Sequence, residues 1–213
     1  MLFGSRTGFG LEFHIERDPQ LLCVDVFLGG LHVNTWDNAF YPPLLVKKLR
    51  DELVRLREPT GPPVGFASPS EFFRLAESWM YDDADAGITP EAGTALARCE
   101  FLEWGECTDE VTALAFPEGD RVHLTWRTYE RGGVARDAEP PNESPREPTV
   151  VSVSRTALVE TLERSLVVAE REWSARLAAL TARGDARDAR DARDARDGGD
   201  GGDGSGRPVN SAG

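Results

Sequence analysis

Apolar and polar residues alternate along three short stretches within residues 9–36, and this pattern predicts three β-strands. The stretches read FGLEFHIE, LLCVDVFL and LHVNTW, and they are separated by RDPQ and by a Gly-Gly pair. Both separators are typical of turns, because proline fixes φ and glycine accepts positive φ. The two turns place Leu11 opposite Val26, and Val26 opposite Val33, so that the apolar side chains share one face. The region therefore predicts an antiparallel three-stranded meander with one buried face.

The same register gathers polar and aromatic side chains on the other face of the meander. Its cross-strand rows are Glu12, Asp25 and Asn34; His14, Cys23 and Trp36; and Phe27 and His32. Carboxylates that face each other across a sheet, such as Glu12 and Asp25, are mildly destabilising. We expect either a solvated face or a face that binds a cationic partner, with Trp36 and Phe27 as aromatic contacts.

Three helices are predicted from the spacing of apolar residues. Leucines three to four positions apart indicate a helix over residues 42–57, which we expect to cover the apolar face of the meander. A second helix begins with Ser68 as the cap, Pro69 in the first position and Glu71 completing a capping box. The last helix runs over residues 154–183 and is about 44 Å long, so its distal part either projects or packs on another chain.

Strand patterns return in the second half of the chain. They cover residues 96–104, 111–116, 121–129 and 149–153, and we expect the last of these to lie beside residues 121–129. The order of elements predicts an α+β fold with a largely antiparallel sheet and helices packed on one face.

The chain has the length of one domain with additions. We expect a single α+β domain over residues 1–183, interrupted by a flexible loop at 130–148 that contains four prolines. Ala-Arg-Asp is repeated four times over residues 186–197. A period of three produces no apolar stripe on a helix, so residues 184–213 are predicted to form a disordered low-complexity tail.

The net charge of the chain favours some classes of binding partner over others. The chain has a formal net charge of −13; without its last 30 residues it holds 19 basic and 30 acidic residues, a net charge of −11. An acidic domain does not favour nucleic-acid phosphate as a direct partner. Acidity alone is consistent with solubility, and it also suits a basic protein partner.

The cysteines and the N-terminal residues indicate the cellular compartment of the protein. Cys23, Cys99 and Cys107 form no CxxC pair and are odd in number, which disfavours a secreted disulfide framework. We find no signal-peptide pattern in MLFGSRTGFG and no apolar run long enough to span a bilayer. The expectation is a cytoplasmic protein that does not contact the membrane.

No catalytic motif in the sequence identifies a reaction. The chain has no GxSxG, Walker or HExxH motif. A metal site or a nucleophile pair on the polar face could be formed by His14, Cys23 and Glu12. No fourth metal ligand is evident, however, and we predict no metal, cofactor or catalytic residue. The acidic loop at residues 81–87 lacks the ligand spacing of a calcium loop and is expected to face solvent.

One family resemblance can be stated. The segments FGLEFHIE, CVDVFLGGLHVNTWDN and LVKKLRDELVRL, within residues 9–57, resemble the opening of immunity proteins of bacterial polymorphic toxin systems. The resemblance implies a stoichiometric inhibitor that masks a toxin, often a basic nuclease. No site residue can be carried over. The Ala-Arg-Asp tail and the high ratio of Arg to Lys resemble an actinobacterial coding sequence.

The leading hypothesis is a non-enzymatic, cytoplasmic protein-binding module of unspecified oligomeric state, and the resemblance implies that it neutralises a toxin by masking a basic partner. Its predicted partner-binding residues are Glu12, Asp25, Phe27, Asn34, Trp36, Asp82, Asp83 and Asp85. One alternative is an enzyme that uses the group formed by His14, Cys23 and Glu12. Another is a structural or dimerisation module built on the C-terminal helix.

Overall fold

The computed structural model describes residues 1–58, 67–80, 89–128 and 147–197, with side chains up to residue 183. The chain divides into two compact units, Met1–Trp173 and Ser174–Gly213. The first unit contains both sheets and most of the helical residues. In the second unit, the described part is helical.

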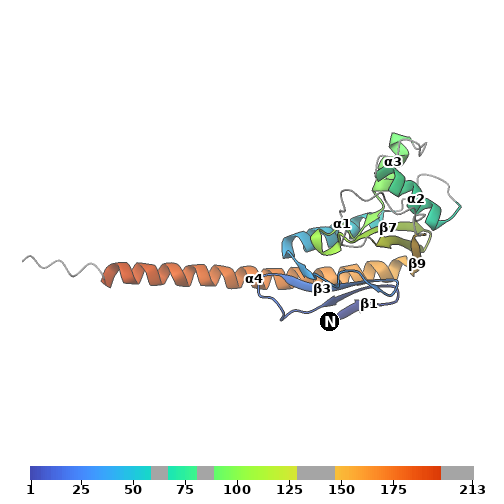
Figure 1. Ribbon diagram of the computed structural model, residues 1–213. Helices are drawn as coiled ribbons and strands as arrows, with labels where there is room; N and C mark the ends of the chain where they lie inside the picture. Colours follow the sequence, from blue (N-terminus) through green and yellow to red (C-terminus); the bar gives the residue numbers. More distant parts are fainter. Residues whose placement is uncertain (59–66, 81–88, 129–146, 198–213) are drawn as a thin grey trace, which may run out of the picture. The chain divides into compact units, whose positions relative to one another are not determined.

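The N-terminal sheet is antiparallel, as predicted, and Figure 1 shows it in blue. Its strands are β1 (Leu2–Gly4), β2 (Phe9–Phe13), β3 (Leu22–Leu28), β4 (Leu31–His32) and β5 (Ala39–Phe40). The first four pair in the order β1-β2-β3-β4, and β5 also pairs with β3. The predicted register is confirmed where Leu11 lies opposite Val26, Glu12 opposite Asp25 and Phe27 opposite His32.

The Gly-Gly turn between β3 and β4 fixes this register. Gly29 and Gly30 have φ values of 57° and 92°, which residues with side chains rarely adopt. A Cβ atom at Gly29 would also overlap the ring of Trp126, so the turn packs directly against the second sheet. The glycine therefore serves both the hairpin and the contact between the sheets.

The third predicted strand ends earlier than expected. Val33 still donates its backbone N–H to the Val26 carbonyl at 2.8 Å, but β4 itself contains only two residues. The chain then leaves the sheet and returns as β5, where Ala39 lies opposite Cys23. The predicted pairing of Cys23 with Trp36 is wrong, because residues 34–38 form a loop instead of a strand.

The remaining strands form a second antiparallel sheet instead of joining the first. This sheet has the order β6 (Glu100–Phe101), β7 (Val111–Glu118), β8 (Arg121–Thr128) and β9 (Thr149–Ser154). The pairing of residues 149–153 with residues 121–129 is confirmed. The expectation of one sheet is corrected to two, within the same α+β class.

The predicted strand at residues 96–104 is mostly wrong. Residues 90–97 form helix α3 (Pro90–Ala97), and only Glu100 and Phe101 are extended into β6. Thr89 caps the helix by accepting a hydrogen bond from the backbone N–H of Ala92, and Pro90 occupies the first turn. This threonine–proline start is a helix signal that outweighs the apolar residues after it.

The helices predicted at residues 42–57 and after Ser68 are confirmed as α1 (Pro42–Arg57) and α2 (Pro69–Met80). The last helix, α4, runs from Arg155 to Asp197. Within the first unit, α1 and α4 lie side by side and antiparallel, joined by ion pairs from Arg50 to Glu170 and from Arg57 to Glu163 at 2.6 and 2.5 Å.

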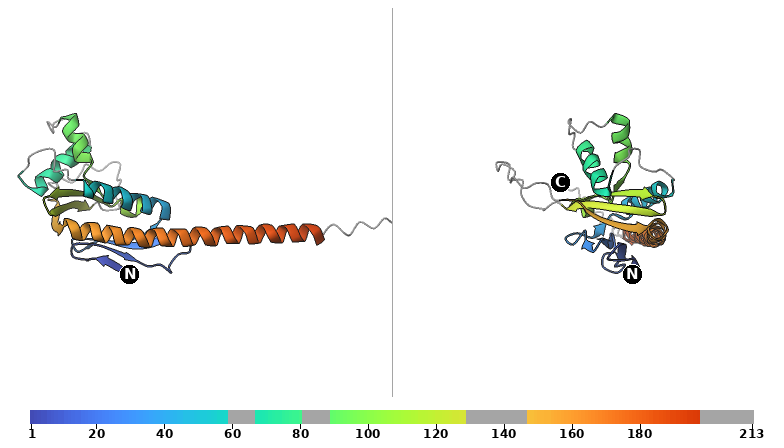
Figure 2. Two further views of the ribbon diagram at one scale, coloured as in Figure 1. Left: turned by 180° about the vertical axis from the view of Figure 1, so that it is seen from behind. Right: turned by 90° about the vertical axis from the view of Figure 1, so that its right-hand side faces the viewer.

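Two hydrophobic clusters hold the first unit together. The larger one combines the inner faces of both sheets with α1 and the first half of α4. The smaller one joins α2 and α3 to the other face of the second sheet through Phe72, Phe73, Leu96, Leu114 and Phe116. Figure 2 shows α2 and α3 on one side of β7–β9 and the N-terminal sheet on the other. The second sheet therefore has α2 and α3 on one face, and its other face belongs to the larger cluster together with the N-terminal sheet, α1 and α4.

The end of α4 also differs from the prediction. The helix continues to Asp197, whereas the apolar stripe predicted an end at Arg183. Alanine and arginine favour the helix strongly, so the Ala-Arg-Asp repeat can extend it without an apolar face. In the described part of the chain, no helix combines the length and the apolar character needed to cross a membrane.

Candidate functional site

Asp25 in β3 lies at the centre of a polar cluster on the N-terminal sheet. This Asp25 cluster consists of Arg6, Glu12, His14, Asp25, His32 and Asn38. Nε2 of His14 lies 2.8 Å from Oδ2 of Asp25. The Asn38 side-chain amide donates to Oδ1 at 2.5 Å, and Nε2 of His32 lies 3.5 Å from the same oxygen. The register of β2, β3 and β4 brings these groups together from three strands.

The surroundings of Asp25 favour its ionised form. Burial alone would raise the pKa of this carboxyl, but hydrogen bonds from Asn38 and His14 and the charges of His14 and His32 outweigh it. The pKa of Asp25 therefore lies below its ordinary value. The carboxylate is a stable anion that holds its neighbours in place.

Arg6 covers the cluster from outside. Its guanidinium lies 2.5 Å from Oε2 of Glu12 and 5.0 Å from the centre of the Phe27 ring. The turn after β1 positions Arg6, since its carbonyl accepts a hydrogen bond from the Gly30 N–H at 2.9 Å. Arg6 thus compensates the charge of Glu12, and the acidic face predicted from the alternation is neutralised by the chain itself.

Three members of the cluster could hold a metal ion. Glu12, His14 and Asp25 each offer one ligand atom, and these atoms all lie within 4.8 Å of one another. Carboxylate oxygen and imidazole nitrogen are common ligands of divalent transition metals. Cys23, the third member of the predicted His14–Cys23–Glu12 group, has a side chain that is buried in the sheet. A buried thiol is a poor candidate for a nucleophile.

Trp36 presents the largest exposed aromatic surface among the described residues, with 79% of its area accessible. It lies in the loop of residues 34–38, which is attached to β3 at both ends. At the first end, the Asn34 amide accepts from the Val26 N–H and donates to the Val24 carbonyl, each at 2.8 Å. At the other end, the Asn38 carbonyl accepts from the Val24 N–H at 2.8 Å. The indole is therefore exposed on a loop with fixed ends.

Acidic side chains gather around Cys107, and one of them, Asp37, follows Trp36 directly in the sequence. Asp37 acts electrostatically on Cys107, which belongs to the short 3-10 helix η2 (Glu106–Thr108). Burial and the charges of Asp37, Glu106 and Asp109 together raise the pKa of the Cys107 thiol to about 11. All three carboxylates are exposed, and no cation of the described residues forms an ion pair with them. We call Trp36, Asp37, Glu106 and Asp109 the Trp36 surface.

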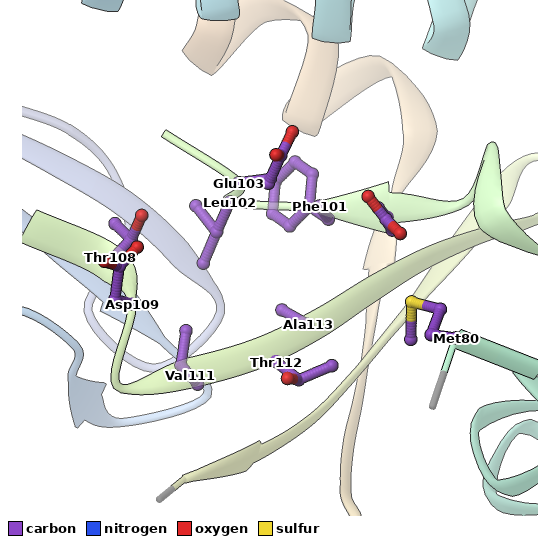
Figure 3. A pocket seen from close by; sticks show the side chains of 10 residues that line it. Met80, Phe101, Leu102, Glu103, Thr108, Asp109, Val111, Thr112 and Ala113 are labelled. Atoms are coloured by element: carbon purple, nitrogen blue, oxygen red, sulfur yellow. The ribbon is translucent and has the colours of Figure 1, made fainter. Parts of the chain in front are cut away.

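A pocket borders this surface along β6 and β7 (Figure 3). Its volume is about 330 Å³, and Thr108 and Asp109 lie at one end and Met80 at the other. Phe101, Leu102, Val111 and Ala113 give it apolar walls, and Glu100 and Glu103 add carboxylates. Burial, followed by the nearby charge of Glu103, raises the pKa of Glu100. The pocket combines an apolar lining with two carboxylates, of which Glu103 is paired with Lys48 at 2.7 Å.

The structure separates the predicted binding residues into three groups. Glu12 and Asp25 come together in the Asp25 cluster. Phe27 and Asn34 are buried, with 9% and 4% of their areas accessible, so the prediction that they are available on an open face is wrong. Trp36 is exposed, although on a loop and not on a strand. Asp82, Asp83 and Asp85 lie outside the described residues.

Several residues of these two sites were not predicted. Arg6 follows β1, a strand too short to show alternation, although the glycines at positions 4 and 8 were a turn signal. Glu106 and Asp109 lie far from Trp36 in sequence, and no local pattern connects them. Asn38 could have been found, because an Asp-Asn pair just before β5 is typical of a turn.

Comparison with known proteins gives one likeness in structure. The fold is similar to that of CdiI from Burkholderia dolosa AUO158, a contact-dependent growth inhibition immunity protein, with a TM-score of 0.52 and 15% sequence identity. The match covers 78% of this chain and 99% of that one. No protein-family model and no curated protein sequence matches the chain.

Proposed function

We propose that this chain is a non-enzymatic, cytoplasmic protein-binding module that neutralises a basic protein toxin by masking it, with the Trp36 surface as its docking site. The observation that carries the proposal is the indole of Trp36, 79% exposed on a loop fixed at both ends and beside carboxylates without a cationic neighbour. Tryptophan is strongly enriched among the residues that contribute most to protein–protein affinity. A fixed loop also loses little conformational freedom on binding.

Charge supports a basic partner. Asp37, Glu106 and Asp109 add local negative charge to a chain whose net charge is −13. Such a surface accelerates the encounter with a cationic protein and disfavours acidic competitors. By contrast, Glu12 and Asp25 contribute little to docking, since Arg6, His14 and Asn38 already satisfy them.

The pocket beside Asp109 suits a long cationic side chain of the partner. Lysine and arginine place their aliphatic stems on apolar walls and direct their charged ends toward carboxylates. Phe101 and Leu102 could contact the stem, and Glu100 could pair with the charged end. A cation there would favour the ionised form of Glu100, whose pKa is raised by burial and then by the charge of Glu103.

The likeness to a CdiI supports the toxin-neutralising role, as does the resemblance of residues 9–57 to immunity proteins. Immunity by masking requires no catalytic group, only a stable surface that is complementary to the toxin. The exposed indole and the exposed carboxylates of the Trp36 surface support this role.

The test is binding to the product of the gene adjacent to that of this chain. We expect the two proteins to co-purify as a complex and the chain to relieve growth inhibition by that product. Trp36→Ala should weaken the complex by about 30-fold or more, the loss expected for an interface tryptophan. Val167→Ala, which shortens another exposed apolar side chain on α4, serves as the matched control and should bind as the unmodified chain does. A failure to form a complex, or equal affinities for Trp36→Ala and the control, would remove the proposal.

A further inference from the structure

The Asp25 cluster contains a fourth potential metal ligand in addition to Glu12, His14 and Asp25. His32 belongs to β4, and the register places it opposite Phe27, two positions along β3 from Asp25. Its ring nonetheless reaches back along the sheet, so that Nε2 lies 3.5 Å from Oδ1 of Asp25. His32 therefore lies next to the group formed by Glu12, His14 and Asp25, on the Oδ1 side of Asp25, and its ring would have to approach the other three ligands to share an ion with them.

The Nε2 atom of His32 faces Asp25 and is free to take a ligand. Its Nε2 atom is shielded from solvent and has no hydrogen-bond partner among the described residues. The Nε2 atom of His14 also faces Asp25, at 2.8 Å. A lone pair on nitrogen repels a carboxylate oxygen at such distances, so each imidazole requires either a proton or a metal ion on the side that faces Asp25. A single divalent ion would satisfy both rings at once.

We propose that Glu12, His14, Asp25 and His32 form a Zn²⁺ site. Two nitrogen and two oxygen ligands in a four-coordinate arrangement suit zinc, whereas calcium and magnesium prefer oxygen alone. Tetrahedral ligands at about 2.0–2.1 Å from zinc are about 3.3 Å apart. The ligand atoms of Glu12, His14 and Asp25 lie within 4.8 Å of one another, so small side-chain rotations bring these three to zinc, and a rotation of His32 toward them would complete the site.

Neighbouring residues would orient the ligands. The Asn38 amide holds Oδ1 of Asp25, which leaves Oδ2 for the metal, as hydrogen bonds from outer residues commonly do at zinc sites. Arg6 occupies Oε2 of Glu12, and the second oxygen of that carboxylate stays available. Through Asn38 the ion would also stabilise the loop that carries Trp36.

Zinc binding to the isolated full-length chain tests the site. The chain is treated with a chelator, dialysed and titrated calorimetrically with Zn²⁺ under reducing conditions. We expect one ion per chain, bound at micromolar concentration or below, and a higher melting temperature with zinc than without it. Calcium and magnesium should give neither signal.

Substitutions of histidine decide where the ion binds. His14→Ala and His32→Ala should each weaken zinc binding by about 100-fold. Glu12→Gln, which keeps the shape of the side chain, should weaken it by about tenfold and guards against loss of fold in the other variants. His123→Ala is the matched control, because His123 bonds to Ser152 and Glu118 on the second sheet and should leave binding unchanged.

The proposal is overturned if the unmodified chain binds no zinc at these concentrations. It is also overturned if folded His14→Ala and His32→Ala chains bind zinc as tightly as His123→Ala does. Because no partner protein is present in this experiment, its failure would leave the proposed docking function untouched.

Discussion

The Asp25 cluster and the Trp36 surface share the loop of residues 34–38, and both contain carboxylates, but their charges are balanced differently. In the cluster, each carboxylate has a partner within the chain: Arg6 for Glu12, and His14 with Asn38 for Asp25. On the Trp36 surface, Asp37 and its acidic neighbours pair with no cation of the described residues. An acidic pattern in a sequence therefore does not distinguish carboxylates that are paired within the chain from carboxylates that are available to a partner.

This comparison predicts that substitutions at the anchors of the loop reduce stability most. Asn34→Ala should lower the free energy of unfolding by about 2–3 kcal/mol, because the Val26 N–H and the Val24 carbonyl lose a buried partner. Thr35→Ala, at the exposed neighbouring position, should change it by less than about 0.5 kcal/mol. Chemical denaturation monitored by circular dichroism measures both. Equal stabilities would show that the loop is not held by the Asn34 amide.

Cys107, near the carboxylates of the Trp36 surface, is a chemical probe whose reactivity should change by an intermediate amount. The pKa of Cys107 is raised to about 11 by burial and by Asp37, Glu106 and Asp109, so at pH 8 its thiol is almost entirely protonated. Because the thiolate is the reacting form, alkylation of Cys107 should be slower than that of free cysteine by about tenfold or more. Mass spectrometry of labelled peptides distinguishes Cys107 from Cys23 and Cys99.

Removing the neighbouring charge should reverse part of this effect. Asp37→Asn with Glu106→Gln lowers the pKa of Cys107, and its alkylation at pH 8 should become several-fold faster. Glu160→Gln, which removes an exposed carboxylate from α4, should leave the rate unchanged. If the double variant and this control react at the same rate, the Trp36 surface does not carry the negative field assigned to it.

The smallest expected effect on stability is that of replacing Arg6, which lies over the Asp25 cluster. Arg6→Ala removes an exposed ion pair with Glu12 and a contact over Phe27, which together stabilise the fold by about 1 kcal/mol or less. Arg74→Ala, which removes a different exposed arginine, is the comparison for this measurement. A loss well above 1 kcal/mol would indicate that Arg6 is a main support of the sheet.

The sequence predicts the N-terminal meander well because two independent turns enforce one register. Gly29 and Gly30 fix one hairpin, and the apolar positions of β2 and β3 agree with it, so the opposition of Glu12 and Asp25 follows. The prediction fails at Asn34, where a side-chain amide takes over the hydrogen bonds of a strand backbone. The alternation of polar and apolar residues cannot distinguish a polar side chain that faces solvent from one that makes the hydrogen bonds normally made by a strand backbone.

The candidate site was predictable only in part, for a similar reason. Trp36 was identified by its residue type, and its exposure follows from the loop that Asn34 begins. Glu106 and Asp109 act together with Asp37 on Cys107, and tertiary packing brings Asp37 to them, which a single sequence does not encode in local spacing. The separation of the strands into two sheets also follows from packing, since Phe9 contacts Phe101 and Gly29 contacts Trp126 across the core.

The dimerisation alternative depends on the second unit. Leu177 and Leu180 extend the apolar stripe of α4 and are about half exposed, with 49% and 52% of their areas accessible. Nothing in the first unit requires them for docking. The complex proposed here is therefore independent of whether this segment self-associates.

The central claim is that docking uses the Trp36 surface and not the polar face of the sheet, and paired charge substitutions test it most directly. The product of the adjacent gene is titrated calorimetrically into the Asp37→Lys/Glu106→Lys chain and into the Glu12→Gln chain, with a chelator present. We expect the first chain to bind at least about 100-fold more weakly than the unmodified chain, and the second to bind within about threefold of it. Unchanged affinity in the first chain together with a large loss in the second would contradict the account.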